Sequence, residues 1–225
     1  MVQDGDVPDY WNDWQLDPEE FNRIIDKNSN ALSAIYGYVA EERLREEYLE
    51  NDDRVTNLRS PADQDSADKG DWAFQWNGEP MKIEVKSLQT HTIEAVDSSQ
   101  TTLIDDGTEP IQYEAGFHLK GTSDQRNITH DGKEYNTTLM NVEDTDIDIM
   151  AVNLYKIKDE WGFAFLRVED LPRSKGSSYP DSLRQKLARS QIKLTIPLRE
   201  PFTKDLYGLM DEILEERDEP AQSSA

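Results

Sequence analysis

The chain has 225 residues, no cysteine, and 47 acidic against 24 basic side chains, so its formal net charge is −23. This length suits a single core with appendages, and we see no internal repeat. The lack of cysteine excludes a disulfide framework and a cysteine zinc site. No run approaches the roughly 18 apolar residues of a membrane helix, and the first residues lack the basic and then apolar pattern of a signal peptide. We therefore expect a cytoplasmic protein.

The acidic residues are spread along the whole chain, and lysine is scarce. This composition is typical of a cytoplasm with very high salt, as in a halophilic archaeon. At about 1 M salt the Debye length is only about 3 Å, so the overall negative field hardly opposes contact with a polyanion. Local basic patches can therefore still bind phosphates.

The first 30 residues are predicted to form an aromatic acidic arm and one short helix. The arm carries Tyr10, Trp11 and Trp14, and the pair Asp17-Pro18 indicates a helix start, with Asp at the N-cap and Pro at the first helical position. A longer helix is predicted over residues 31–50, because apolar residues recur there at helical spacing: Ala31, Ala34, Ile35, Tyr38, Leu44, Tyr48 and Leu49.

Two carboxylates, Glu41 and Glu42, fall on the two sides of this apolar stripe. At least one of them should face inward or lie at the border of the stripe, and we favour Glu41. The alternative is that both belong to a solvated helix face together with their acidic neighbours.

A β-hairpin is predicted in residues 70–90, after a first strand at residues 54–58 and a polar loop. The dipeptide Asn77-Gly78 favours a two-residue type I′ turn. Counting outward from that turn pairs Trp76 with Glu79, Phe74 with Met81, Trp72 with Ile83 and Asp71 with Glu84. One face of the hairpin is then apolar, and the other carries Asp71, Glu84 and Lys86.

Two carboxylates on opposed residues of a hairpin would repel each other by about 3 kcal/mol at an effective dielectric near 20. A divalent cation between them removes the repulsion. Mg²⁺ is commonly held by one or two carboxylates with water and phosphate oxygens, and there it activates water for phosphodiester hydrolysis. Lys86 could orient or deprotonate that water. A solvated ladder of alternating charges is the simpler alternative.

The arrangement Asp71 with Glu84-Val85-Lys86 resembles the PD-(D/E)XK nuclease family, in which an Asp at a strand start precedes Glu or Asp, any residue, and Lys on the next strand. Gly37 and Glu41 also match the pattern G-x-x-x-E of the helix that precedes the family's catalytic sheet. The resemblance covers about residues 31–174. It implies an α/β (α+β) fold with a restriction-endonuclease-like core, which is a central mixed β-sheet flanked by helices.

The resemblance further implies a Mg²⁺-dependent DNA endonuclease of restriction type, with Mn²⁺ as a possible substitute. Asp71, Glu84 and Glu41 would hold metal, and Lys86 would complete the catalytic set. DNA is the expected partner, with a homodimer and a cognate methyltransferase as further expectations. The alternatives are a DNA-repair nuclease and a non-catalytic nucleic-acid-binding domain of the same fold.

After residue 90 the pattern is weaker. A strand is predicted at residues 111–120, a hairpin at Asp131-Gly132, and two buried strands at residues 147–156 and 161–168; the family's second helix is not evident in residues 91–130. Asp146 and Asp148, at the start of this strand pair, are interpreted as structural. The three histidines lack the spacing of a zinc or H-N-H site, and no phosphate-binding loop or nucleophile elbow occurs.

Residues 173–199 reverse the charge of the chain, because seven basic side chains accompany the single acidic Asp181, for a net charge of +6. A helix over residues 181–190 would project Arg184, Lys186 and Arg189 toward a phosphate backbone, with Lys120 and Arg126 as further DNA contacts. The alternative is a basic face docked on the acidic body. The nuclease-like domain is predicted to span residues 31–200, followed by a helix in 201–217 that packs on it and a disordered tail in 218–225.

Overall fold

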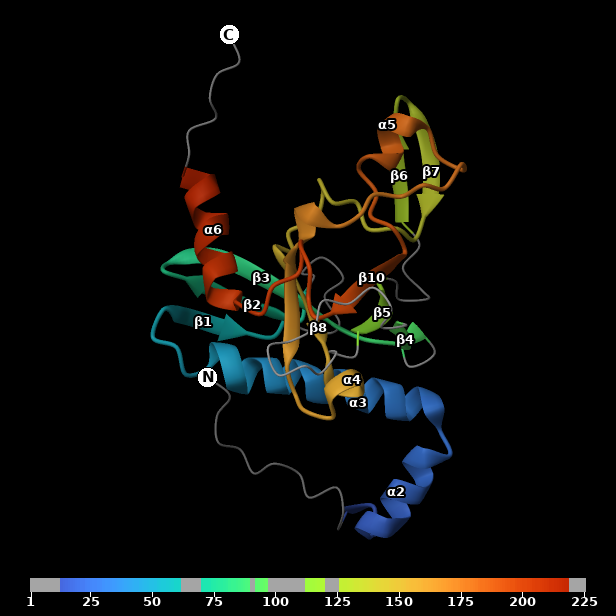
Figure 1. The fold of residues 1–225 in the computed structure, drawn as a ribbon, viewed down its shortest axis with the longest axis vertical. Coiled ribbons are helices and arrows are strands. Elements are labelled where there is room, and N and C mark those ends of the chain that lie inside the picture. Colours follow the sequence, from blue (N-terminus) through green and yellow to red (C-terminus); the bar gives the residue numbers. More distant parts are fainter. Residues whose placement is uncertain (1–12, 62–69, 90–91, 97–111, 120–125, 219–225) are drawn as a thin grey trace. The chain divides into compact units, whose positions relative to one another are not determined.

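The computed structural model describes residues 13–61, 70–89, 92–96, 112–119 and 126–218 (Figure 1), and the chain divides into two compact units, Met1–Val39 and Ala40–Ala225. The predicted arm residues Tyr10 and Trp11, the site residue Lys120 and tail residues 219–225 lie outside the described residues. Among the described helices, none is both long and apolar enough to cross a membrane.

The N-terminal unit contains the predicted short helix, α2 (Pro18–Asp26). Asp17 caps it as expected, since its carboxylate accepts a hydrogen bond from the Glu20 amide at 2.7 Å and the Glu20 carboxylate accepts one from the Asp17 amide at 3.3 Å. This reciprocal capping box satisfies two backbone donors at the helix start.

Helix α3 (Ser29–Leu44) continues as the π-helical segment η1 (Arg45–Leu49), so the long helix predicted over residues 31–50 is confirmed. Ala40, Leu44 and Leu49 are fully buried, at a spacing of four and then five residues. The second spacing is one residue too long for an α-helix, and the wider turn of η1, closed by a hydrogen bond from the Glu50 amide to the Arg45 carbonyl, brings Leu49 back to the core.

The second unit is built on a five-stranded sheet in the order β1-β2-β3-β8-β9. Its strands are β1 (Val55–Arg59), β2 (Trp72–Trp76), β3 (Glu79–Ser87), β8 (Ile149–Asn153) and β9 (Phe163–Arg167). β3 and β8 are parallel and the other pairs are antiparallel. The predicted mixed sheet is therefore confirmed, and the class is mixed α/β.

Buried apolar residues lie on both faces of β8 and β9. On one face Trp76, Ile83 and Phe165 pack with Leu206 and Met210 of helix α6 (Leu206–Asp218) in a single apolar cluster. On the other face, Met150 and Leu166 join residues of a second sheet, β10-β5-β4, in another cluster. That sheet contains β4 (Glu94–Val96), β5 (Gln112–His118) and β10 (Gln191–Ile196). A third sheet, β6 (Arg126–His130) with β7 (Lys133–Thr137), forms the hairpin predicted at Asp131-Gly132.

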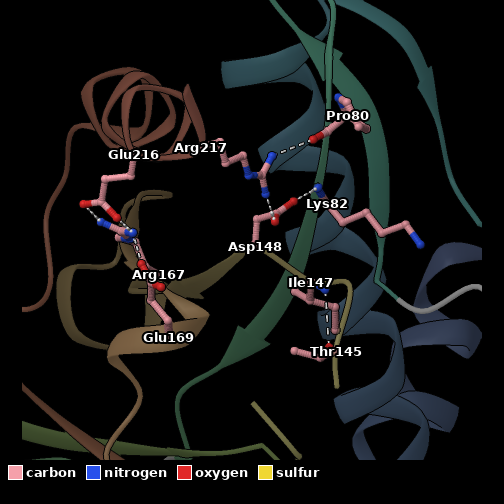
Figure 2. A network of polar contacts seen from close by, with 9 residues as sticks. All are labelled: Pro80, Lys82, Thr145, Ile147, Asp148, Arg167, Glu169, Glu216 and Arg217. Atoms are coloured by element: carbon pink, nitrogen blue, oxygen red, sulfur yellow. Dashed lines mark hydrogen bonds and ion pairs between the residues drawn. The ribbon is translucent and has the colours of Figure 1, made fainter. Parts of the chain in front are cut away.

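Charged side chains fix the end of α6 to the sheet (Figure 2). The Asp148 carboxylate lies between the Lys82 amide, which donates to it at 2.7 Å, and the Arg217 guanidinium of α6. Arg217 also donates to the Pro80 carbonyl at 3.0 Å. Arg167 of β9 pairs with Glu216 in the same helical turn. These contacts agree with the structural role predicted for Asp148, and Asp146 pairs with Lys82 in a similar role.

Three predicted elements are wrong in extent. The C-terminal helix predicted in residues 201–217 begins only at Leu206 and ends at Asp218, as α6. The strand predicted through residue 156 ends at Asn153, whose side-chain oxygen accepts a hydrogen bond from the Tyr155 amide at 2.9 Å and so starts the single helical turn α4 (Tyr155–Lys158). The helix predicted over residues 181–190 is reduced to the single turn α5 (Asp181–Arg184), because Ala188 forms a bridge with Arg173 and the chain then enters β10.

Candidate active site

The hairpin that carries the candidate site has the predicted turn and register. Asn77 and Gly78 both have positive φ, 51° and 91°, as a type I′ turn requires. The pairs Trp76–Glu79, Phe74–Met81 and Trp72–Ile83 are all formed. The six residues predicted for the apolar face are buried: Trp72, Phe74, Trp76, Met81, Ile83 and Val85. The strand alternation therefore directs Glu84 and Lys86 to the opposite face.

Asp71 lies just before β2 and is held against the neighbouring strand. Regular pairing ends at Trp72 and Ile83, so the predicted ladder pair of Asp71 with Glu84 is not formed. Instead, the Asp71 amide donates to the Ile83 carbonyl at 2.9 Å, and its carboxylate accepts a hydrogen bond from the Val85 amide at 2.6 Å. Since Val85 separates Glu84 from Lys86, this bond fixes the Asp71 carboxylate beside both.

Gly70 makes this approach possible. Its φ is +100°, in the region that L side chains rarely adopt, and an added Cβ would lie 3.4 Å from the Ile83 carbonyl oxygen. The chain can therefore turn sharply into β2 and still place Asp71 close to β3.

Glu84 and Lys86 form an ion pair on the polar face of β3, where their side chains retain 19% and 24% of their exposure. Burial lowers the pKa of the Lys86 ammonium, but the negative charges of Glu84, Asp71 and Glu41 and the hydrogen bond to Glu84 outweigh it, so the pKa lies above its ordinary value. Lys86 is accordingly a cation at neutral pH. The suggestion that it deprotonates a water is not favoured, whereas orienting one remains compatible with the charge.

Glu41 belongs to the same group of charges. The indole of Trp72 donates to the Glu41 carbonyl at 3.0 Å, which fixes α3 next to the start of β2. The Glu41 charge contributes to the raised pKa of Lys86. Glu42, in contrast, is exposed and pairs with Arg45 at 2.9 Å. Of the two alternatives left open by the sequence, the geometry favours Glu41.

The donors present suit a hard, oxygen-binding cation. Asp71, just before β2, and Glu84 of β3 supply carboxylate oxygens, and the charge of Glu41 on α3 acts on the same lysine. Across the described ranges, however, no three acidic or histidine side chains are grouped closely enough to form a complete metal cage. Mg²⁺ needs no such cage, because one or two carboxylates with waters and phosphate oxygens are its usual protein ligands.

The predicted DNA-binding residues do not form one helical face. Arg184 pairs with Asp181, and Lys186 pairs with Glu143. In the described part of the chain no ion pair involves Arg189. Arg126 begins β6, and its side chain lies outside the description, as does the whole of Lys120. The alternative considered above, docking on the acidic body, fits the pair of Lys186 with Glu143, whereas the pair of Arg184 with Asp181 is local to α5.

Two positioning groups were missed from the sequence, the Val85 amide and the Trp72 indole. The position of Trp72 directly after Asp71 was an available signal for the second, because a buried indole N–H needs an acceptor. For the Val85 amide the sequence carries no such signal. Whether this amide can bond the Asp71 carboxylate depends on where the β2–β3 pairing ends.

Comparison with known proteins adds no relative: no protein-family model matches the chain, and searches of curated proteins and of solved structures find no match. The candidate site therefore rests on the geometry of its own residues.

Proposed function

We propose that this protein is a metal-dependent DNA endonuclease of the PD-(D/E)XK type, with a restriction-endonuclease-like core. The observation that carries the proposal is the Glu84–Lys86 ion pair together with the Asp71 carboxylate, which the Val85 amide holds against the same strand. An incidental ladder of alternating surface charges would not cover three-quarters of the Lys86 side chain, nor fix a second carboxylate, Asp71, to the backbone of the same strand.

The order of elements supports the same proposal. Helix α3 is followed by β1 and then by the β2–β3 hairpin, which is the order that the resemblance to the nuclease family implies. The site residues occupy the ends of these elements: Glu41 near the end of α3, Asp71 before β2, and Glu84 with Lys86 in the second half of β3.

Each side chain has a role that its environment supports. Asp71 and Glu84 would hold Mg²⁺ or Mn²⁺, with Glu41 beside them, and such a cation polarises a phosphodiester and activates water. Lys86, kept cationic by its neighbours, binds and orients the attacking water and offsets the negative charge that develops on the phosphate. The Val85 amide keeps the Asp71 carboxylate turned toward β3. The two strands therefore need not reorganise when a metal cation binds.

A restriction-type role in defence, with a homodimer that cuts both strands and a cognate methyltransferase, is the biological context that we propose. A DNA-repair nuclease would use the same site. A non-catalytic nucleic-acid-binding domain would retain the fold and bind DNA without hydrolysing it.

Cleavage of supercoiled plasmid in KCl at concentrations that preserve the fold tests the proposal, with Mg²⁺ or Mn²⁺ and with EDTA as the metal-free arm. We expect metal-dependent nicking or linearisation by the wild type and none by Glu84→Gln. The matched control is Glu79→Gln, an exposed carboxylate on the same strand, which should cleave like wild type. Equal cleavage by Glu84→Gln, or no cleavage by the wild type with either metal, would refute the nuclease assignment.

A further inference from the structure

The β6–β7 hairpin is a narrow two-stranded ribbon. Its strands pair with each other and with no other described strand. Asp131 and Gly132 at its tip both have positive φ, 49° and 72°, so a two-residue turn closes it. The open space around Gly132, with no atom within 4 Å of an added Cβ, shows that this tip is unobstructed by described residues.

One face of the ribbon is already occupied by the segment around α5. The Tyr179 hydroxyl donates to the Thr137 hydroxyl at 2.9 Å, and the Tyr179 ring lies 6.4 Å from that of Tyr135. His130 and Ser182 are hydrogen-bonded at 2.7 Å. These contacts come from both strands, so this face holds the ribbon on its support (Figure 1).

The opposite face is polar and exposed. Cross-strand pairing places Asn127 opposite Asn136 and Thr129 opposite Glu134, and all four side chains are exposed. The two amides share a single hydrogen bond of 3.2 Å, from Asn136 to Asn127. Each amide group has further donor and acceptor capacity beyond that bond. No apolar side chain interrupts this face, so it does not resemble a protein docking surface.

Asn, Thr and Glu side chains, the types exposed on this face, all read base edges in DNA complexes. Asn bonds adenine through two hydrogen bonds, a Thr methyl contacts the thymine methyl, and Glu accepts from the cytosine amino group. The major groove, about 12 Å wide, admits a two-stranded ribbon. The supporting segment, residues 173–189, carries five basic side chains and only Asp181 as an acid. Three of the five are already engaged: Arg184 with Asp181, Lys186 with Glu143, and Arg173 with backbone carbonyls. Lys175 and Arg189 form no ion pair among the described residues, so they would supply the phosphate contacts beside the base-reading groups.

We propose that the outer face of β6–β7 reads bases in the major groove of duplex DNA, with Asn127 and Asn136 as the main specificity-determining residues. The inference rests on the proposed function for its partner, because it takes DNA as the ligand. It assigns sequence selection to a region separate in sequence from Asp71, Glu84 and Lys86. Variants of the ribbon should thus lose selective binding without losing catalysis, and variants of the candidate active site should lose cleavage without losing selective binding.

The test is selection from a pool of randomised duplex DNA, with Ca²⁺ replacing Mg²⁺ to prevent cleavage, at the lowest KCl that preserves the circular dichroism of the fold. We expect the wild type to enrich a motif. The double variant Asn127→Ala/Asn136→Ala should lose about 5- to 150-fold of its preference for that motif over a scrambled duplex, the discrimination of one bidentate base contact. Its affinity for the scrambled duplex should be unchanged.

The matched control is Asn51→Ala, which removes an exposed asparagine with one hydrogen bond, 3.3 Å long, away from the ribbon, and should keep the wild-type preference. A second variant, Glu134→Gln, should shift the preferred base at one position. An unaltered motif in both ribbon variants, equal losses on motif and scrambled duplex, or no motif for the wild type would overturn the proposal. A selected motif without plasmid cleavage would instead refute only the nuclease assignment.

Discussion

The β2–β3 and β6–β7 hairpins have the same kind of turn and opposite surroundings. Both turns end in glycine, and both central residues of each have positive φ. The first hairpin lies in the middle of a five-stranded sheet with Trp76 fully buried, whereas the second pairs with no other described strand and exposes four side chains on one face. The turn residues thus determine the register, and the strand residues determine whether a hairpin becomes core or surface.

The strongest way to break this comparison is to truncate one aromatic residue in each hairpin. Trp76 stacks on Tyr207 with ring centroids 5.6 Å apart and donates to Asp211 at 2.7 Å. Trp76→Ala should therefore lower the free energy of unfolding by about 3–5 kcal/mol. Tyr135→Ala, in the outer hairpin, should cost less than about 2 kcal/mol. Urea unfolding measures both, and equal losses would show that the two hairpins contribute alike to the core.

Two variants of Asp71 separate its role in metal binding from its structural role as a hydrogen-bond acceptor. Asp71→Ala leaves the Val85 amide without its acceptor, which should cost about 1–3 kcal/mol. Asp71→Asn retains a side-chain oxygen at that position and should unfold nearly like wild type. Both variants should lose metal-dependent cleavage. If Asp71→Asn cleaves normally, the carboxylate is needed only as a hydrogen-bond acceptor.

The two turn glycines sharpen the comparison, because nothing lies within 4 Å of a Cβ added at either. The cost of Gly78→Ala and of Gly132→Ala is thus backbone strain alone, about 1–2 kcal/mol. Gly78→Ala should lower global stability by that amount. Gly132→Ala should mainly accelerate amide hydrogen exchange in β6 and β7, since that hairpin can open locally. Global destabilisation of the same size by both would argue against independent opening.

The smallest expected effect concerns Asp148, whose carboxylate accepts a hydrogen bond from the Lys82 amide of β3. Burial raises the pKa of Asp148, although the Lys82 amide and Arg217 act in the opposite sense. The folded protein therefore holds this proton more tightly than the unfolded chain does, and stability must fall as the pH rises from about 4 through the raised pKa. Asp148→Asn should remove this part of the decline in thermal melting. A steeper decline in the variant would reverse the sign and contradict this interpretation.

Local chemistry explains which parts of the fold were predictable. The Asn77-Gly78 turn, the alternation in β2 and β3, and the Asp17 cap depend on neighbours in sequence, and all are confirmed. The predicted helix around Arg184 and Lys186 failed because its second half pairs with distant residues: Met140 accepts the Ala188 amide, and Lys186 pairs with Glu143. Such long-range contacts leave no periodic trace in a short polar segment.

The same distinction applies to the candidate site. Spacing alone placed Asp71, Glu84 and Lys86 on one hairpin, and the structure brings them together. The choice between Glu41 and Glu42 required the position of α3, which is set by the contact of Trp72 with the Glu41 carbonyl. The end of the β2–β3 ladder at Trp72, rather than at Asp71, likewise depends on the turn at Gly70 and not on strand propensity.

Binding of Mn²⁺ tests the central claim, that Asp71 and Glu84 form a cation site, most directly. Electron paramagnetic resonance counts free Mn²⁺, and about 1 M KCl suppresses diffuse binding to a chain of charge −23. We predict a saturable site in the wild type and in the control Glu79→Gln, which is lost in Asp71→Asn and in Glu84→Gln while their melting temperatures stay near that of wild type. Undiminished saturable binding by both site variants would contradict the account.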